Sequence, residues 1–417
     1  MNKSRWIAWR TGLAMKLLLV NQYYAPDVCS SGQLLASLCE GLAEKGFQVD
    51  VVCGFPSYTA DAPDALTYEE WPNLTVHRVA TGGVKGRLGM RQRIQGYLGF
   101  LLAAFGTIRR QSREQKYTVV LTLSNPPFVG LLGAWVKRFR GARYVYILHD
   151  IHPDILIRTG RLKGGLAARL WNAVNGVILR SADEVVVLGS QMAKHLQEHK
   201  GVPEQKITVI PNWSLNDIKP LPRQNLFREI HNLGDALVVL YAGNMGISHN
   251  LELLVESAAE LRGRKVEFLF VGEGEKRSIL EELAGQKCLD NVLFLPYQET
   301  EMLNAMLCAA DICVVALEPE LAGLAVPSKT YPILAAGRAI LALTSEHDDV
   351  AAVVKQWQCG WVAQNSTEVT EIIQAAIQQP GEVARCGERA REAHESAFSR
   401  ESALQSYADL IKKVASS

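Results

Sequence analysis

The residues best suited to chemistry lie in a few short segments that each follow an apolar run. Pro327–Gly337 reads Pro-Ser-Lys-Thr-Tyr-Pro-Ile-Leu-Ala-Ala-Gly and follows the apolar run Ile312–Leu317. Ser328 suits a helix N-cap and Gly337 a helix stop, so Lys329 is expected at the start of a helix. The start of a helix can bind a phosphate, because it offers free backbone N–H groups and the positive end of the helix dipole. The alternative is a solvated lysine on an ordinary turn between a strand and a helix.

A second segment places two imidazoles and two carboxylates within six residues. His149–Asp154 reads His-Asp-Ile-His-Pro-Asp and follows the apolar run Tyr144–Leu148. A metal site needs three or four converging ligands, and the sequence has no second cluster with ligand spacing, so no metal is expected. An acid–base or charge-stabilising role for His149, Asp150 and His152 is the functional interpretation. The alternative is a buried His–Asp pair that serves the structure.

Two glycine-rich turns each follow an expected strand and precede an expected helix. They are Gly243–Gly246, with the sequence Gly-Asn-Met-Gly, and Gly272–Gly274, with the sequence Gly-Glu-Gly. Such turns bring backbone N–H groups close to a diphosphate. The second turn lacks the third glycine of the dinucleotide fingerprint, and no Walker A lysine loop occurs. Together with Lys329, the turns predict a nucleoside diphosphate pocket and argue against a hydride-transfer enzyme.

A basic and apolar segment stands out in the first half of the chain. Lys85–Lys116 holds eight Lys and Arg residues against one acid, Glu114, and these charges flank the largely apolar run Tyr97–Ile108. That run is shorter than the ~20 residues of a spanning helix, but it suits the headgroup boundary of an anionic leaflet. A core helix with a solvated basic end is the alternative. No helix-turn-helix, zinc finger or RNA-recognition signature supports nucleic acid as a partner. The membrane contacts are predicted at Arg91, Arg93, Arg109 and Arg110.

The overall charge supports the same interpretation. Lys and Arg outnumber Asp and Glu by 26 to 15 in residues 1–211, and the acids outnumber the bases by 28 to 18 in residues 212–417. Such an asymmetry points to an anionic surface met by the first half. The eight cysteines form no CxxC pair, which is typical of reduced core residues in a cytosolic protein. Basic residues interrupt the N-terminus, so no signal peptide is expected. The expected location is cytoplasmic, at the inner face of the plasma membrane.

Short apolar runs alternate with helical patterns along the whole chain. This alternation predicts an α/β fold with two doubly wound, Rossmann-like domains that face each other across a cleft. Residues 1–14 are expected to form a flexible extension. Val209–Trp213 is expected to be a linker between domains at 15–211 and 212–390, because Pro211 ends a strand and a polar segment to Pro222 follows. Residues 391–417 form the closing segment. The expected strands lie at 17–20, 49–53, 76–79, 119–122, 144–148 and 184–188, which closes the first set, and at 238–242, 267–271, 292–295, 312–317 and 339–344.

The order of these motifs resembles a known family. The matching segments are Asn21-Gln22-Tyr23-Tyr24-Ala25-Pro26-Asp27, Gly54-Phe55-Pro56-Ser57-Tyr58, Ser124-Asn125-Pro126-Pro127, Asp150-Ile151-His152-Pro153-Asp154, Pro211-Asn212-Trp213, Tyr241–Gly246, Val271–Gly274 and Pro327–Gly337. The chain resembles the bacterial glycosyltransferases of family 4, which have the GT-B fold. Within that family it is similar to the branch that builds cell-surface polysaccharides, such as the colanic acid-type and O-antigen amino-sugar transferases.

The resemblance implies a retaining transfer of a hexose or N-acetylhexosamine from a nucleotide-diphosphate sugar, expected to be a UDP-sugar. The acceptor would be a hydroxyl of a lipid-linked or saccharide molecule, and the nucleotide-sugar is a substrate, so no cofactor is expected. The first domain would bind the acceptor, the second the donor, and the last helix would cross back to the first domain. The resemblance implies catalytic roles for His149, Asp150, His152 and Lys329. Donor contacts would come from Gly243, Asn244, Gly246, His249, Gly272, Glu273, Gly274, Tyr297, Glu320, Ser328 and Lys329, and acceptor contacts from Tyr24, Ser31, Gly32 and Asn125.

The chain departs from the family pattern at several positions. Asn244 and His249 stand where much of the family has an Arg and a Lys, so Lys329 would carry most of the charge on the diphosphate. The paired glutamates of the family fall on Leu324 and Pro332, and Glu318 or Glu320 could take over the ribose contact. His152 stands where relatives have Trp. Two other functions therefore stay open: a UDP-sugar 2-epimerase-like isomerase, which would need carboxylate bases in the cleft, and a non-catalytic scaffolding homologue.

Overall fold

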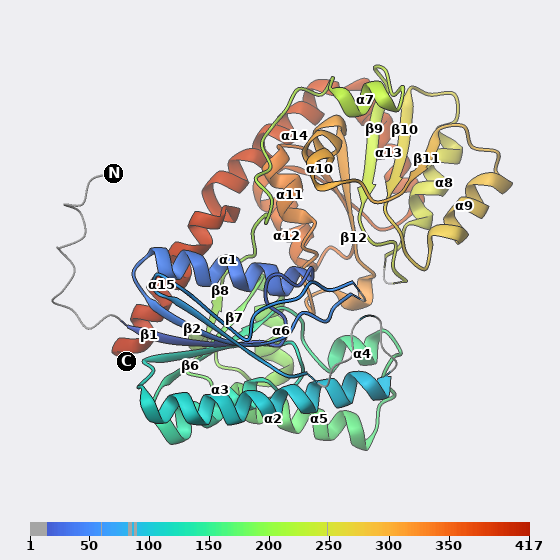
Figure 1. Cartoon of the computed structure of the whole chain (residues 1–417). Helices are drawn as coiled ribbons and strands as arrows, with labels where there is room; N and C mark the ends of the chain where they lie inside the picture. Colours follow the sequence, from blue (N-terminus) through green and yellow to red (C-terminus); the bar gives the residue numbers. More distant parts are fainter. Residues whose placement is uncertain (1–14, 60, 82–85, 87–89, 248) are drawn as a thin grey trace, which may run out of the picture.

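The chain folds into two α/β domains joined by a linker and by the C-terminal helix (Figure 1). This computed structural model describes residues 15–59, 61–81, 86, 90–247 and 249–417. The extension expected at residues 1–14 lies outside the described residues. Each domain is a mostly parallel sheet with helices on both faces, so the expected fold class is confirmed.

The sheet of the first domain has, in its described part, eight strands in the order β3-β4-β2-β1-β5-β6-β7-β8. All pairs are parallel except β3 with β4. Six of these strands agree with the predicted ranges to within about two residues, whereas the edge strands β3 and β8 are not predicted. The strands are β1 (Lys16–Val20), β2 (Gln48–Gly54), β3 (Tyr68–Trp71), β4 (Leu74–Val79), β5 (Val119–Leu123), β6 (Arg143–Leu148), β7 (Glu184–Val187) and β8 (Ile207–Val209).

Alternate residues of the central strands serve two separate cores, because successive side chains of a strand point to opposite faces. Leu17 and Leu19 pack under the first helix layer, whereas Leu18 and Val20 pack under the second. The first layer is α1 (Ser30–Glu44) with α15 (Arg400–Ser416), and the second contains α2 (Met90–Glu114), α3 (Gly130–Arg140), α5 (Leu166–Ser181) and α6 (Ser190–Lys200) (Figure 1). The short helix α4 (Asp154–Arg158) follows β6.

The second domain has, where described, a six-stranded parallel sheet in the order β11-β10-β9-β12-β13-β14. Five strands were predicted, and only the edge strand β14 was missed. The strands are β9 (Leu237–Ala242), β10 (Val266–Val271), β11 (Val292–Leu295), β12 (Ile312–Ala316), β13 (Ala339–Leu343) and β14 (Gly360–Ala363). One face is covered by α7 (Leu226–Ile230), α10 (Thr300–Ala309), α11 (Thr330–Ala336), α12 (Asp349–Trp357) and α14 (Pro380–Ala393), and the other by α8 (Glu252–Glu260), α9 (Arg277–Gln286) and α13 (Ser366–Gln378).

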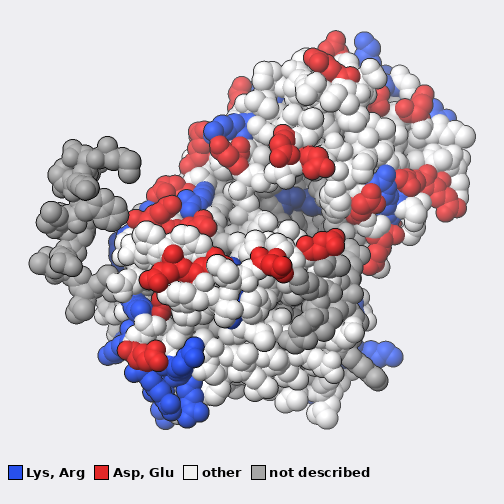
Figure 2. Space-filling model, viewed as in Figure 1, with Lys and Arg blue, Asp and Glu red and all other residues white. Residues whose placement is uncertain are grey.

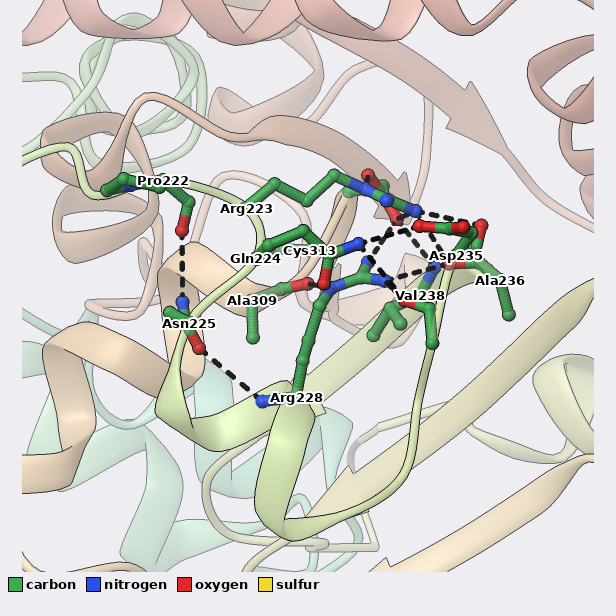
Figure 3. A network of polar contacts seen from close by, with 12 residues as sticks. Pro222, Arg223, Gln224, Asn225, Arg228, Asp235, Ala236, Val238, Ala309 and Cys313 are labelled. Atoms are coloured by element: carbon green, nitrogen blue, oxygen red, sulfur yellow. Dashed lines mark hydrogen bonds and ion pairs between the residues drawn. The ribbon is translucent and has the colours of Figure 1, made fainter.

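A buried arginine fastens the end of the linker to the second sheet (Figure 3). Arg228 is fully buried, and its guanidinium donates to the Ala309 carbonyl at 2.7 Å and to Asp311 Oδ2 at 2.7 Å. Asp311 also accepts from Arg223 on the linker and from the N–H of Val238, the second residue of β9. A buried charge needs partners of this kind, because an unpaired one is strongly destabilising. The network therefore fixes where the second domain begins.

The closing segment returns to the first domain. Helix α14 packs on the second domain, a short π-helical turn follows at His394–Phe398, and α15 then lies against α1 (Figure 1). Leu404, Tyr407 and Ile411 of α15 belong to the core of the first domain. Arg400 donates to Ser37 Oγ of α1 at 2.9 Å. The chain thus connects its two domains twice.

Candidate active site

The loops at the carboxyl ends of both sheets meet between the domains, which is where open parallel sheets bind ligands. Three adjoining cavities lie there. The inner cavity, in the second domain, has a volume of about 240 Å³ and an apolar lining that includes Leu240, Val271 and Leu303, with Tyr297 and Gln298 beside it. The central cavity, between the domains, measures about 550 Å³. The outer cavity, of about 260 Å³, opens on the first domain.

Shared wall residues show that the three cavities form one path. The inner and central cavities share Ala242, Gly243, Lys329 and Pro332. The central and outer cavities share Ser30, Leu34, Asp150, Val326 and Ser328. Figure 2 shows the hollow between the domains, with basic side chains deep inside it and acidic ones around its rim. Along this path, Lys329 lies between the inner and central cavities, and Asp150 lies between the central and outer cavities.

Lys329 lies at the centre of this path. It is the residue before α11, so the predicted helix start is confirmed, although Lys329 and not Ser328 occupies the N-cap position. Its Nζ is buried without a hydrogen-bond partner and lies 3.8 Å from the centroid of the Tyr241 ring. Burial lowers the pKa of Lys329 to about 7. A buried ammonium without an anion is costly, so this residue is poised for an anionic ligand.

The glycine turns bring their two loops together. A Cβ on Gly272 would lie 2.2 Å from the Gly243 carbonyl oxygen, and one on Gly274 would lie 2.4 Å from that of Met245. The N–H groups of Gly243 and Met245 already donate to Val271 and Glu273. These two N–H groups are thus used within the fold and are not free for a phosphate. Of the predicted donor residues in the two turns, Gly243 and Asn244 line the central cavity, whereas Gly246, Gly272, Glu273 and Gly274 line none of the three cavities.

His249 is held against the same tyrosine. The Tyr241 hydroxyl donates to the Asn244 carbonyl at 2.6 Å and lies 2.8 Å from His249 Nδ1. Burial, and then the charge of Lys329, lower the pKa of His249 to about 4. His249 is therefore neutral near pH 7 and adds no charge to the central cavity, which leaves Lys329 as the cation among its described wall residues.

The His149–Asp154 loop is tied to the second domain. Asp150 and Ala325 form a backbone bridge, and the Ile151 N–H donates to the Leu324 carbonyl at 2.9 Å. This bridge places Asp150 in the wall of both the central and the outer cavity. His149 lines the outer cavity, and burial lowers its pKa despite the opposing charge of Asp150.

The second half of that loop faces away from the path. His152 lines none of the three cavities, and its ring lies 6.1 Å from that of Trp171. Asp154 accepts from Lys200 Nζ at 2.6 Å and lies 3.6 Å from His195 Nε2. Burial opposes its ionisation, but the contacts with His195 and Lys200 outweigh burial and lower the pKa of Asp154 to about 2. Asp154 therefore positions the loop.

Of the remaining predicted donor and acceptor residues, some line the cavities and others lie in the protein core. Ser31 and Asn125 line the outer cavity, Ser328 lines the central and outer cavities, and Tyr297 lines the inner one. Tyr24 is a core residue, and Gly32 lets α1 approach the backbone of residues 23 and 24. Glu320 lies outside all three linings, and Glu318 faces Lys276 at 3.8 Å.

Several residues in the cavity walls are not predicted from the sequence. Ser30 is the first residue of α1, because the Cys29 sulfur caps the helix by accepting from the Gly32 N–H. The linker residues Trp213–Asn216 line the central cavity, and the Pro211-Asn212-Trp213 motif was the one sequence signal near them. Tyr58 reaches the outer cavity because the buried Asp27 carboxylate holds its N–H and that of Ser57. Within the described ranges, no group of three or more His, Cys, Asp or Glu could hold a metal ion.

Comparison with known proteins identifies the family of this chain. The "Glycosyl transferase 4-like domain" family matches residues 31–213, and "Glycosyl transferases group 1" matches residues 236–379. The chain belongs to the glycosyltransferases. The first matched region contains seven of the eight described strands of the first sheet, all but β1, and the second contains all six described strands of the second sheet. The path of cavities therefore lies where the two family domains meet.

Individual relatives agree with this family along nearly the whole chain. The putative colanic acid biosynthesis glycosyl transferase WcaI of Escherichia coli K12 is 26% identical over 413 residues, which cover 95% of this chain and 100% of the relative. Sucrose-phosphate synthase from Thermosynechococcus elongatus has a TM-score of 0.76 at 20% identity, covering 96% of this chain and 99% of that chain. Anabaena Alr3699/HepE in complex with UDP has a TM-score of 0.70 at 16% identity, covering 96% and 100%. These likenesses establish the two-domain GT-B fold.

Proposed function

We propose that this glycosyltransferase moves a sugar from a nucleotide-diphosphate sugar, in the first instance a UDP-sugar, to a hydroxyl of a lipid-linked or saccharide acceptor, with retention at the anomeric carbon. The observation that carries the proposal is the buried, partnerless Nζ of Lys329 at the wall shared by the inner and central cavities. The apolar inner cavity suits a nucleobase, and Lys329 suits the diphosphate that follows it. The names of the relatives, which refer to colanic acid and to bound UDP, support polysaccharide biosynthesis and this donor class.

The reaction breaks the bond between the anomeric carbon and the diphosphate oxygen and forms one to the acceptor oxygen. Negative charge gathers on the leaving diphosphate, so the Lys329 ammonium stabilises the transition state more than the bound donor. Positive charge gathers on the sugar, and the carboxylate of Asp150 stands across the cleft to oppose it. The acceptor enters from the outer cavity, past Ser31, Asn125 and His149, and its proton leaves with the departing diphosphate. The Lys329 ammonium offsets the negative charge of the leaving group, so the proposal invokes no metal cofactor.

Thermal unfolding with UDP, GDP, dTDP and their common sugars tests the donor site. A ligand that binds only the folded state at ~100 times its dissociation constant adds ~2.7 kcal/mol of stability. Stabilisation by one nucleotide series is expected, and it should be lost in Lys329→Ala. If no series stabilises the protein, the chain is better explained as a non-catalytic homologue.

We further propose that the first domain docks on the anionic inner leaflet of the plasma membrane through the outer face of α2. Phe100, Ala104 and Ile108 of this helix are buried against the sheet. The inner face of α2 is thus part of the core, as the alternative interpretation of this segment expects. On its outer face, Ile94, Leu98 and Leu102 recur every four residues and are 49%, 54% and 74% exposed.

Basic groups follow this stripe toward the C-terminal ends of α2 and α3, and such charges favour an anionic surface. Arg109 and Arg110 near the end of α2 are exposed, and Lys137, Arg138 and Arg140 end α3. Figure 2 shows basic side chains gathered at the lower left, where these helices end in Figure 1. The side chains of Arg91 and Arg93 lie outside the described residues. No helix in the described part of the chain is long and apolar enough to cross a membrane.

A further inference from the structure

Two neighbouring carboxylates are buried where the two domains meet. Asp348 is 0% exposed and Asp349 is 3% exposed, and both stand at the start of α12 in the second domain. Asp349 reaches across to the first domain and accepts from the Gln191 and Met192 N–H groups of α6. We propose that Asp348 carries a proton when the domains are closed, and that this proton makes Asp348 a positioning residue for the reaction. Its role in the reaction rests on the proposed transferase function, whereas the proton itself does not.

No basic side chain neutralises this pair. Among the described residues, no Lys or Arg lies within ion-pair distance of either carboxylate, and Asp349 is the charged group that acts on Asp348. The groups that contact them are backbone N–H groups and the Ser190 hydroxyl. Two adjacent ionised carboxylates without a counter-charge are costly to bury, so one of them is expected to take up a proton.

The charged residues on the surrounding elements are exposed or have partners of their own. On α6, Lys194 pairs with Glu198, and His195 and Lys200 face Asp154. In the loop of residues 317–329, Glu318 faces Lys276 and Glu320 is exposed. On the turn before α12, Glu346 pairs with Lys355 and His347 is exposed, and Arg389 of α14 donates to the Gln358 carbonyl at the opposite end of α12.

Hydrogen bonding shows which carboxylate holds the proton. Both oxygens of Asp349 accept backbone N–H groups at the N-terminus of α6, where the helix dipole also favours a negative charge. Asp348 uses Oδ1 to cap α12 by accepting from the Val350 N–H at 2.8 Å, but its Oδ2 is buried without a hydrogen-bond partner. An unpaired neutral hydroxyl costs far less than an unpaired charge. Burial raises the pKa of Asp348 to about 7, the Val350 N–H opposes this rise, and the charge of Asp349 adds to it.

The same carboxyl group is connected to the candidate active site. Asp348 lies beside the Gly323 backbone, in the loop of residues 317–329. Gly323 has a φ of 71°, and a Cβ on it would lie 3.2 Å from an α6 carbonyl, so this loop, α6 and α12 meet at one point. Two residues later Ala325 bridges Asp150, and the loop ends at Lys329. The proton on Asp348 therefore stabilises the contact that holds Asp150 opposite Lys329.

The sign of the pH dependence follows from these surroundings. When the domains open, Asp348 becomes solvated and its pKa returns to about 4, whereas in the closed protein its pKa is about 7. Closure therefore takes up one proton between these values, and the ratio of closed to open protein falls by up to ~10-fold for each pH unit as the pH rises toward 7. Above pH 7 the carboxylate is ionised in both states, so closure is weakest there and this group adds no further change.

Hydrogen exchange of the unliganded, full-length protein tests the proposal. The Gln191 and Met192 N–H groups lose their acceptor when the domains open, so their protection factors report the closed state once they are corrected for the intrinsic exchange rate at each pH. These protection factors should be at least ~10-fold higher at pH 5.5 than at pH 8, as one linked proton requires. Equal protection at the two pH values would overturn the proposal.

A single substitution assigns the proton to Asp348. Asp348→Asn keeps the shape and the helix cap but stays uncharged, so protection should remain at its high value up to pH 8. Asp50→Asn is the matched control, because Asp50 is also buried but bonds Tyr117 and pairs with Lys16 within the first domain. It should keep the wild-type pH dependence. Urea unfolding shows that both variants fold, and a folded Asp348→Asn protein that keeps the wild-type pH dependence would also overturn the proposal.

The pH profile of turnover separates a positioning role from a merely structural one. The kcat of Asp348→Asn at pH 8 should equal or exceed that of the wild type, because the uncharged side chain no longer opposes closure. A residue with a structural role alone would lose kcat at every pH when it is replaced, and that result would refute the positioning role. If exchange behaves as expected but no nucleoside diphosphate binds, the proton on Asp348 stands and the proposed transferase function fails.

Discussion

The Nζ atom of Lys329 lies 3.8 Å from the centroid of the Tyr241 ring and has no hydrogen-bond partner among the described residues. The tyrosine hydroxyl is occupied elsewhere, by the Asn244 carbonyl and His249 Nδ1. The aromatic face is thus the group that receives the ammonium, through a weak cation–π attraction. Such a site has an unfavourable desolvation energy that a bound anion would relieve.

Replacing this lysine should separate stability from activity. Lys329→Met keeps the aliphatic stem and removes the unpartnered amine, so the free energy of unfolding in urea should rise by ~1–3 kcal/mol. Turnover of the donor should fall by ~10²-fold or more. Lys276→Met is the matched control, since Lys276 is similarly buried but bonds Glu252 and the His249 carbonyl, and it should lose stability. A Lys329→Met protein that is less stable than the wild type would show that the amine has a partner in solution.

The affinity for a nucleoside diphosphate should depend on pH above neutrality. The pKa of Lys329 is lowered to about 7 in the free protein by burial, and a bound diphosphate must raise it. Binding therefore takes up a proton above pH 7, and affinity falls as pH rises, by up to ~10-fold per unit as linkage requires. Calorimetry of UDP, GDP and dTDP between pH 7 and 9, in buffers of different ionisation enthalpy, measures both effects. Lys329→Arg stays charged throughout, so a pH dependence that persists in it would assign the proton to another group.

The buried parallel strands and the two-domain organisation could be predicted from the sequence. The buried parallel strands appeared as apolar runs, and the order of motifs indicated both domains. The edge strands β3, β8 and β14 were missed. Tyr68–Trp71 is largely exposed and holds two adjacent glutamates, and β8 and β14 are only three and four residues long, so each offers too little hydrophobic pattern. In the site, Lys329 and Asp150 were found from their motifs. The roles of Tyr241 and of the linker residues Trp213–Asn216 depend on which loops meet in space, and local periodicity does not contain that.

Lys200 should position the His149–Asp154 loop through Asp154. Lys200→Met removes the 2.6 Å contact, so kcat should fall ~10-fold, as small displacements of reacting groups do, while the KM of the donor stays constant. The pKa of Asp154 should then rise from about 2 toward its ordinary value. The lowered pKa contributes stability above pH 3.8 that is lost as pH falls toward 2, so the variant should lose stability at neutral pH more than at pH 2. Lys194→Met, on the same helix with an exposed 3.9 Å pair, is the control.

Asp349 should hold the two domains together at the start of α6. Its carboxylate, from the second domain, accepts from the Gln191 N–H at 2.7 Å and the Met192 N–H at 3.1 Å. Asp349→Ala leaves these N–H groups unsatisfied, at a cost of ~1–2 kcal/mol by analogy with a lost N-cap. We expect a larger radius of gyration in X-ray scattering and a lower kcat/KM, with unchanged affinity for the nucleoside diphosphate, because Lys329 and Gly243 stay within the second domain.

Gly189→Ala offers an independent route to the same contact. Its Cβ would lie 2.2 Å from Asp349 Cγ, so it should open the domains in the same way, and the double variant should add little to either single change. Asp217→Asn changes an exposed linker carboxylate and serves as the control. Full additivity of Asp349→Ala and Gly189→Ala would mean that the two changes act at separate places.

Membrane binding should depend on the outer stripe of α2 more than on any single charge. Leu98→Ser and Leu102→Ser each remove an exposed apolar side chain, and each should weaken binding to vesicles with anionic lipid by ~10-fold or more, since burying a leucine contributes ~1.5–3 kcal/mol. Neutralising Arg109 or Arg110 should cost ~1 kcal/mol each near the surface, and the cost should fall as the salt concentration rises. Ile279→Ser, at an exposed apolar position on α9 of the second domain, should leave binding unchanged. Sedimentation with vesicles measures all of them. If Leu98→Ser and Leu102→Ser sediment like the wild type but abolish self-association in light scattering, the stripe is an interface between copies of this chain and not a membrane surface.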